Sequence, residues 1–121
     1  MDITPLIASD RQVIQSYSAG RFKVSSVVHE GPVLVFPAQT KSWAVAASSV
    51  KASDFDAISK SDVDVILFGC GATFTSPMLE LRAALKERGM VLEVMDTGAA
   101  CRTYNVLLSE GRRVAAALLP V

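Results

Sequence analysis

The sequence predicts a single α/β domain in which parallel strands are flanked by helices and by an N-terminal layer of β-hairpins. Two apolar runs, Val63–Phe68 and Met90–Met95, are each followed by a polar junction and then by apolar residues at helical spacing. Successive strand–helix units of this kind place their strands side by side and parallel. Residues 21–28 alternate polar and apolar side chains instead, which is typical of antiparallel structure with one wet face. A length of 121 residues suits one domain, spanning 1–121.

Short β segments separated by turns fill the first half of the chain. Residues 1–10 show no sustained period and are expected to form a loosely held arm. Ser18–Gly20 is a turn signal, and the strand that follows it is expected to direct Phe22 and Val28 toward the core. In chain order, the predicted elements are strands at Val13–Tyr17, Arg21–Val28, Val33–Phe36 and Ser42–Ala46, and a short helix capped by Ser53.

Two longer helices are predicted after the two central strands. Ser76 and Pro77 suit the N-cap and first position of one helix, and Gly89 suits its left-handed end. Its core face is predicted to be Met78, Leu81, Ala84 and Leu85. Its outer side carries Arg82, Lys86 and Arg88, which we interpret as a solvated face.

The other helix follows the second junction. Asp96 or Thr97 can cap it, and Gly111 ends it before a last apolar strand at Arg113–Leu119. Its apolar stripe is predicted to be Ala100, Tyr104, Leu107 and Leu108.

Composition argues against several kinds of partner. Lysine plus arginine and aspartate plus glutamate each number 12, and the formal net charge of +0 argues against nucleic acid and against an anionic membrane surface. The mean hydropathy of +0.36 is high, yet no uncharged apolar run approaches the ~18 residues of a spanning helix. We therefore expect no direct membrane span, and we expect the apolar surplus in a buried sheet or on a partner surface.

The predicted compartment is the cytoplasm. Residues 1–14 show neither the pattern of a secretory signal nor that of an arginine-rich transit peptide. The two cysteines, Cys70 and Cys101, suit reduced thiols better than a disulfide framework.

The two polar junctions form the predicted site. Gly69, Cys70 and Gly71 end one central strand, and Asp96 and Thr97 end the other. Both loops should therefore lie at the carboxyl edge of the parallel strands, where open α/β sheets place ligands. The third glycine of a dinucleotide fingerprint and the Walker lysine are missing, so a nucleotide is not favoured.

The cysteines at these junctions could form a redox pair or act as nucleophiles. Cys101 falls in the first turn of a helix, whose dipole would lower the pKa of the thiol. However, the only histidine, His29, is expected in a distant turn, and the chain has no CxxC motif. A packing role for both cysteines is therefore favoured over a catalytic one.

Arg102 is the cation placed nearest to both junctions. We expect it to share one side of its helix with Asn105, three positions further on. It could bind a carboxylate or a phosphate. The alternative is a structural ion pair with Asp96, and this ion pair is favoured.

The sequence predicts neither a metal site nor a cofactor. Two cysteines and one remote histidine are a poor ligand set for zinc. Asp54 and Asp56 are explained by the dipole of a first helical turn, since no calcium loop follows them. A serine hydrolase would need a base that the chain scarcely has, so a non-catalytic protein is favoured over an enzyme.

Three stretches resemble a known family: LFGCG, ELRAAL and GMVLEVMDTGAACRTYNVLLSEGRRVAAAL. They are similar to the domain-of-unknown-function 498 family, which includes mitochondrial complex I assembly factor 3. The resemblance implies a three-layer α/β fold with a central mixed sheet. Residues elsewhere that fall where the family has a similar pattern are Tyr17, Gly20, Phe22, Pro37 and Trp43. Residues that match its specific motif are Asp96, Thr97, Arg102, Thr103, Tyr104 and Asn105.

The same resemblance carries most of the functional prediction. The family has no established reaction, and its best-described members assist assembly of the respiratory NADH dehydrogenase. This implies a non-catalytic assembly or adaptor protein whose partner is a respiratory-complex subunit or membrane-insertion machinery, here in a bacterial relative because no mitochondrial presequence is visible. The alternative is a protein that binds an anionic metabolite, or an unrecognised enzyme, with a cleft at the carboxyl ends of the parallel strands. That cleft would use Gly69–Gly71, Asp96, Thr97 and Arg102.

Overall fold

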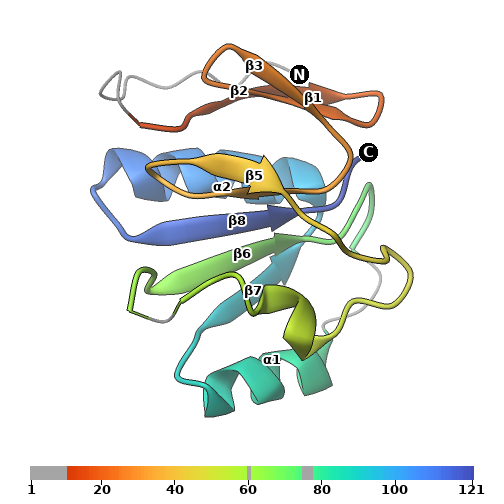
Figure 1. The fold of residues 1–121 in the computed structure, drawn as a ribbon, viewed down its shortest axis with the longest axis vertical. Helices are drawn as coiled ribbons and strands as arrows, with labels where there is room; N and C mark the ends of the chain where they lie inside the picture. The colour runs from red at the N-terminus through yellow and green to blue at the C-terminus, as the bar shows by residue number, and fades with distance from the viewer. Residues whose placement is uncertain (1–10, 60, 75–77) are drawn as a thin grey trace.

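A mixed five-stranded sheet runs through the centre of the molecule (Figure 1). The structure is a computed structural model, and it describes residues 11–59, 61–74 and 78–121. The strand order is β5 (Thr40–Ser42), β4 (Val33–Val35), β8 (Val114–Leu118), β6 (Val65–Gly69) and β7 (Leu92–Met95). Strands β8, β6 and β7 are parallel, whereas β4 is antiparallel to both β8 and β5. The predicted parallel pairing of the two central apolar runs is therefore confirmed.

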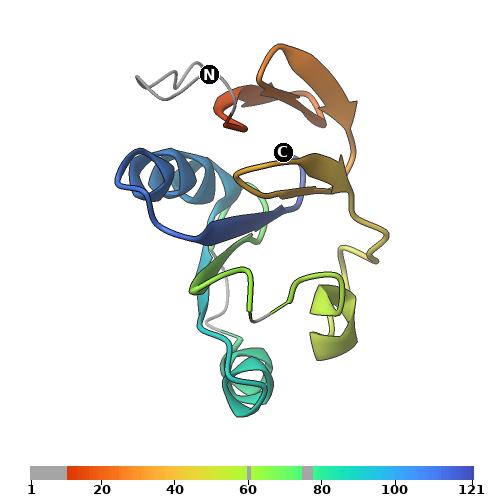
Figure 2. The same cartoon turned by 60° about the vertical axis from the view of Figure 1, so that its left-hand side comes forward.

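Two further layers cover the faces of this sheet (Figure 2). Helix α2 (Thr97–Ser109) and a small antiparallel sheet lie on one face. The small sheet has the order β1 (Ile14–Ser18), β2 (Arg21–Val24) and β3 (Val27–Glu30). Helix α1 (Leu79–Glu87) and the 3₁₀ helix η1 (Ala52–Phe55) lie on the other face. The predicted fold class, a mixed α/β arrangement with an N-terminal hairpin layer, is confirmed.

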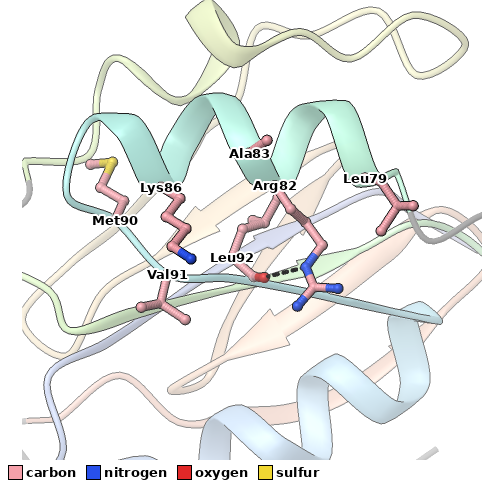
Figure 3. Close-up of a pocket in the computed structure, with 7 residues that line it drawn as sticks. All are labelled: Leu79, Arg82, Ala83, Lys86, Met90, Val91 and Leu92. Atoms are coloured by element: carbon pink, nitrogen blue, oxygen red, sulfur yellow. Dashed lines mark hydrogen bonds between the residues drawn. The ribbon is translucent and has the colours of Figure 1, made fainter.

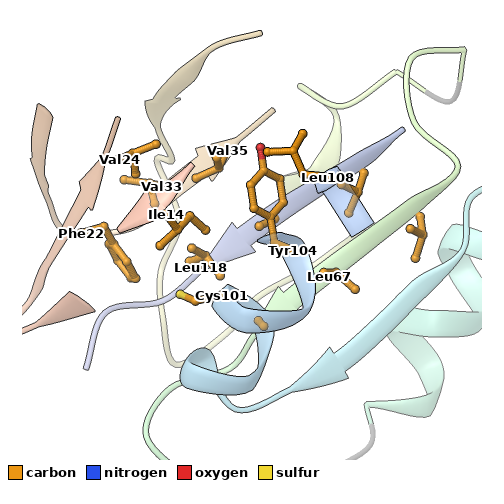
Figure 4. Packing of buried hydrophobic residues seen from close by; sticks show 14 residues of the cluster. Ile14, Phe22, Val24, Val33, Val35, Leu67, Cys101, Tyr104, Leu108 and Leu118 are labelled. Atoms are coloured by element: carbon orange, nitrogen blue, oxygen red, sulfur yellow. The ribbon is translucent and has the colours of Figure 1, made fainter. Parts of the chain in front are cut away.

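Both faces of the sheet are apolar at its three inner strands, β4, β6 and β8, which is why these strands read as continuous apolar runs. On one face, Phe22 and Tyr104 pack with side chains of β4, β6 and β8 (Figure 4). On the other, the rings of Trp43, Phe55 and Phe68 form a triangle with centroids 5.4, 5.9 and 5.8 Å apart. Strand β8 contributes three consecutive buried alanines, and these small side chains let both outer layers approach the sheet closely.

Glycine ends both long helices as predicted. Gly89 follows α1 with φ 80°, and Gly111 follows α2 with φ 76°, a left-handed conformation that costs glycine little. The cap predicted at Ser76 and Pro77 lies outside the described residues, as does the arm predicted at 1–10. No helix in the ranges that the structure describes is long and apolar enough to cross a membrane.

The strand predicted over Arg21–Val28 is wrong. The chain turns at Ser25 and Ser26, with φ 44° and 72°, and returns as β3 in a hairpin with β2. Val28 is consequently 58% exposed instead of sharing the inner face with Phe22. The turn is stabilised by a residue outside the hairpin: the Val13 N–H donates to the Ser25 hydroxyl, and the Ser25 N–H donates to the Val13 carbonyl. The alternation of polar and apolar residues could not reveal these contacts, because their partners lie 12 residues apart in the sequence.

Two other boundaries differ from the prediction. The strand predicted at Ser42–Ala46 ends at Ser42, although Trp43 still donates its N–H to the Pro32 carbonyl at 3.0 Å. The helix predicted from Ser53 is one 3₁₀ turn that begins after Lys51. The Asp54 carboxylate stabilises the start of this turn, because it accepts from the Lys51 N–H at 2.7 Å.

Candidate functional site

The two predicted junctions meet at Thr97, directly beyond the carboxyl ends of β6 and β8. The buried Thr97 hydroxyl donates to the Leu119 carbonyl at 2.7 Å and accepts from the Gly71 N–H at 3.0 Å. The Thr97 N–H donates to the Gly71 carbonyl at 2.8 Å. These bonds satisfy backbone groups at the point where three chain segments leave the sheet. Thr97 therefore fastens the strand ends to one another.

Asp96 and Gly69 complete this junction. Asp96 is the N-cap of α2, since its backbone is extended and its Oδ1 accepts from the Ala99 N–H at 2.8 Å. The other predicted cap, Thr97, is the first helical residue. A Cβ added to Gly69 would lie 3.0 Å from Thr97 Cα and 3.0 Å from Leu118 Cδ2. This close approach accounts for Gly69 without a phosphate ligand.

The two cysteines lie on opposite faces of the central sheet. Cys101 is fully buried in the cluster of Figure 4, whereas the half-buried Cys70 packs against the other cluster. Burial raises the pKa of the Cys101 thiol to about 12 and outweighs the lowering effect of Arg102. The expected activation of Cys101 by the helix dipole is therefore wrong, because the thiol lies more than one turn inside α2 and away from water.

Tyr104 and Asn105 hold α2 against the start of the small sheet. Asn105 is 3% exposed, and its amide nitrogen donates to the Ile14 carbonyl at 2.8 Å. Its amide oxygen accepts from the Ile14 N–H at 3.1 Å. The Tyr104 hydroxyl donates to the Gln12 carbonyl at 2.9 Å, and burial raises the pKa of this phenol. These side chains satisfy backbone groups of Ile14, the first residue of β1, and of Gln12, just before β1.

Arg102 lies at the exposed rim of the same contact. Its guanidinium donates to the Tyr17 hydroxyl at 3.3 Å. A Cβ added to Gly98 would lie 2.5 Å from that hydroxyl, so the ring of Tyr17 needs glycine beneath it. Thr103, the next motif residue, is half-buried. Arg102 and Asn105, which were expected to share one side of the helix, both contact β1. The burial of Asn105 leaves it unavailable to a soluble ligand.

The junction consists of polar groups that are already satisfied. Within the described ranges, no buried side-chain nitrogen or oxygen lacks a hydrogen-bond partner. The same residues include no group of three His, Cys, Asp or Glu side chains that could hold a metal ion. His29 lies in β3 opposite Phe22, and the turn predicted for it is wrong. Thr97 joins the strand ends, and Arg102, Tyr104 and Asn105 hold α2 against the segment that includes β1.

A groove of about 350 Å³ lies elsewhere, between α1 and the start of β7 (Figure 3). Leu79 and Val91 face it and are 64% and 52% exposed, although both are apolar. Strand β7 is an edge of the central sheet. The Arg82 guanidinium donates to the Leu92 carbonyl on this edge at 3.2 Å. The other residues that line the groove are Ala83, Lys86 and Met90.

The groove was not predicted from the sequence, although one signal was present. Leu79, Ala83 and Lys86 recur at steps of four and three, so they form a second stripe beside the predicted core face of α1. Arg82 and Lys86 were interpreted as part of a solvated face. The exposed leucine at the start of that stripe is the feature that distinguishes a binding face from an ordinary solvated one.

Comparison with known proteins gives consistent matches over nearly the whole chain. Residues 14–119 match a family described as "Protein of unknown function (DUF498/DUF598)". An uncharacterized protein of Rhodobacter capsulatus is 36% identical over 113 residues, which cover 89% of this chain and 84% of that protein. The NADH dehydrogenase (ubiquinone) 1 alpha subcomplex assembly factor 3 of Danio rerio is 36% identical over 116 residues. That match covers 93% of this chain and 67% of the zebrafish protein.

A solved structure shares the same fold. The crystal structure described as an outer membrane protein from Bartonella henselae has a TM-score of 0.82 and 31% sequence identity to this chain. The match covers 93% of this chain and 98% of that one. The fold described above is therefore shared with nearly all of that solved chain.

Proposed function

The chain belongs to the DUF498/DUF598 family, and we propose that it is a non-catalytic assembly or adaptor protein that holds a protein partner in the groove between α1 and β7. The zebrafish relative is named as an assembly factor for NADH dehydrogenase, and we extend that role to this chain. The proposed partner is a subunit of the respiratory NADH dehydrogenase or part of the membrane-insertion machinery. Because this chain spans about two thirds of the zebrafish protein, the role is proposed for the shared domain.

The exposure of Leu79 and Val91 carries the proposal. An apolar side chain that is more than half exposed on each wall of one groove leaves apolar surface in water, and burial of that surface favours association. The groove is concave, so a side chain of the partner can contact both walls at once. No chemical step is needed for such a role.

The charge of the groove indicates the chemistry of the partner. Arg82 and Lys86 lie on its α1 wall, and among the described residues that line it there is no acidic side chain. Glu93 lies 3.9 Å from Arg82, but both are about half exposed and a pair of this kind contributes little. A partner segment with apolar anchors flanked by aspartate or glutamate would complement this surface.

The edge of β7 bears on how that segment binds. An exposed edge strand can accept a strand from another chain, but Arg82 already covers the Leu92 carbonyl on this edge. An added strand would have to displace this bond. We therefore propose that the partner inserts side chains into the groove without extending the sheet.

Affinity purification of the tagged chain from its own host tests the role and the surface together. Subunits of respiratory NADH dehydrogenase or of the insertion machinery should be recovered. Val91→Asp should reduce their recovery about tenfold, because a carboxylate replaces an apolar contact and repels an acidic partner. Val28→Asp is the matched control, since it changes a similarly exposed valine on β3 and should leave recovery unchanged.

The two parts of the proposal can fail separately. Repeated recovery of neither class of protein would refute the assembly role. Recovery of these proteins with Val91→Asp as efficiently as with the unchanged chain would refute the groove and leave the role intact. A cytoplasmic location belongs to the same proposal, and fractionation of host cells tests it against the outer membrane indicated for the Bartonella protein.

A further inference from the structure

A second hollow lies at the opposite end of the central sheet from the predicted junctions. Its volume is about 430 Å³, within the range of small-molecule sites. It forms where the chain enters β8 and leaves β4. Arg112 and Arg113 line it from the α2–β8 turn, Lys41 from β5 and Arg11 from the segment before β1. Phe36 supplies part of an apolar wall.

Positive charge is concentrated around the hollow, although the chain has a formal net charge of +0. Its four cationic side chains face one lining carboxylate, that of Asp62. Arg113 is paired with groups that do not line the hollow: its guanidinium donates to Asp64 at 2.6 Å and to the Ser61 carbonyl at 2.7 Å. Positive charges therefore outnumber negative ones by four to two at this place.

Three of these cations remain available. Among the described residues, Arg11, Lys41 and Arg112 take part in no ion pair. The Lys41 ammonium lies 5.3 Å from the centroid of the Phe36 ring, which positions it without cancelling its charge. The three come from segments far apart in the sequence, and the fold holds them together despite their mutual repulsion. An anion in the hollow would remove that repulsion.

We propose that this hollow binds a small organic anion with at least two negative charges, carried as carboxylates or as a phosphate ester. The guanidinium groups of Arg11 and Arg112 present planar pairs of donors that match carboxylate and phosphate oxygens. The apolar wall at Phe36 and Pro37 would contact the carbon skeleton of the same molecule. A nucleic acid fits poorly, because the chain has no net positive charge and the hollow has one aromatic ring.

Titration with citrate and with glucose 6-phosphate tests the two forms of the ligand. In low-salt buffer, at least one of the two should bind. Binding should change the NMR chemical shifts of backbone amides in residues 36–41 and 111–113. Arg112→Gln should weaken binding about tenfold, the value of one charge-assisted hydrogen bond. Arg21→Gln, which removes the same charge from the outer face of the small sheet, should change it less than about twofold.

Several results would overturn the proposal. The proposal is overturned if both probes have dissociation constants above about 10 mM. It is also overturned if Arg112→Gln and Arg21→Gln bind the probes with equal affinity. Inorganic phosphate binding as tightly as glucose 6-phosphate would exclude the organic part of the ligand. If hexaglutamate binds and neither small molecule does, the ligand is an acidic peptide and the proposal of a small organic anion is wrong. Arg112→Gln should leave partner recovery unchanged, so failure here is distinct from failure of the assembly role.

Discussion

Replacement of Asn105 with leucine should detach the small sheet from α2. The side chain is 3% exposed and satisfies both the N–H and the carbonyl of Ile14, which is itself fully buried. Leucine branches at the same carbon but is larger and cannot donate or accept a hydrogen bond. An orphaned buried polar group costs about 1–3 kcal/mol, so the two groups together should cost about 2–6 kcal/mol. That is a large share of the roughly 5–15 kcal/mol that stabilises a domain.

The assay should separate local detachment from global unfolding. Trp43 is the only tryptophan and lies on the face of the central sheet away from α2, so its fluorescence during urea unfolding reports on the main core. Amide exchange over β1–β3 reports on the small sheet. Val106→Leu is the control, because it creates leucine at the adjacent exposed position and should change stability by less than about 0.5 kcal/mol.

Asn105→Asp sharpens the test. Aspartate keeps the acceptor for the Ile14 N–H, and it regains a donor for the Ile14 carbonyl only when protonated. Burial raises the pKa of a carboxyl group above its unfolded value, so this variant should lie closer to wild type at pH 4 than at pH 7. The reasoning is refuted if Asn105→Leu matches the control in both urea midpoint and amide protection. It is also refuted if the deficit of Asn105→Asp does not change with pH.

Two further predictions concern the junction. Thr97→Val should lower the free energy of unfolding by about 2–4 kcal/mol in urea titrations because it removes one buried and one partly buried hydrogen bond. Thr97→Ser should keep most of that stability, and equal losses for the two variants would assign the effect to the methyl group. Cys101 should resist iodoacetamide at pH 7.5 until the protein unfolds, and rapid alkylation of the native thiol would contradict its burial. Because the folded pKa of Cys101 is raised from 9.0 to about 12, stability should fall as pH rises above about 9, and Cys101→Ala should reduce that fall.

Local signals were sufficient for much of the fold. The apolar runs of β6 and β7, the cap at Asp96 and the glycines that end both helices act through neighbouring residues, so the sequence shows them directly. The hairpin at Ser25 and Ser26 was missed for the opposite reason. Serine has no strong preference for positive φ, and the bonds that hold the turn come from Val13, just before β1, and from Gln15 in β1.

Prediction of the site was limited by the same distinction. A polar side chain at the end of a buried strand indicated Thr97, and the helix side shared with Arg102 and the family motif indicated Asn105. Whether such a group binds a ligand or satisfies the backbone depends on partners far along the chain, and Ile14 lies 91 residues from Asn105. The sequence could locate these polar groups but could not show that their bonds were already made.

The distribution of satisfied and unsatisfied groups favours binding at the margins of the sheet. Its two faces are covered by the outer layers, and Thr97 closes the carboxyl ends of β6 and β8. Leu79 and Val91 are more than half exposed, and among the described residues Arg11, Lys41 and Arg112 form no ion pair. Exposed apolar side chains at one margin and cations without ion pairs at the other suit a protein that works by holding another molecule.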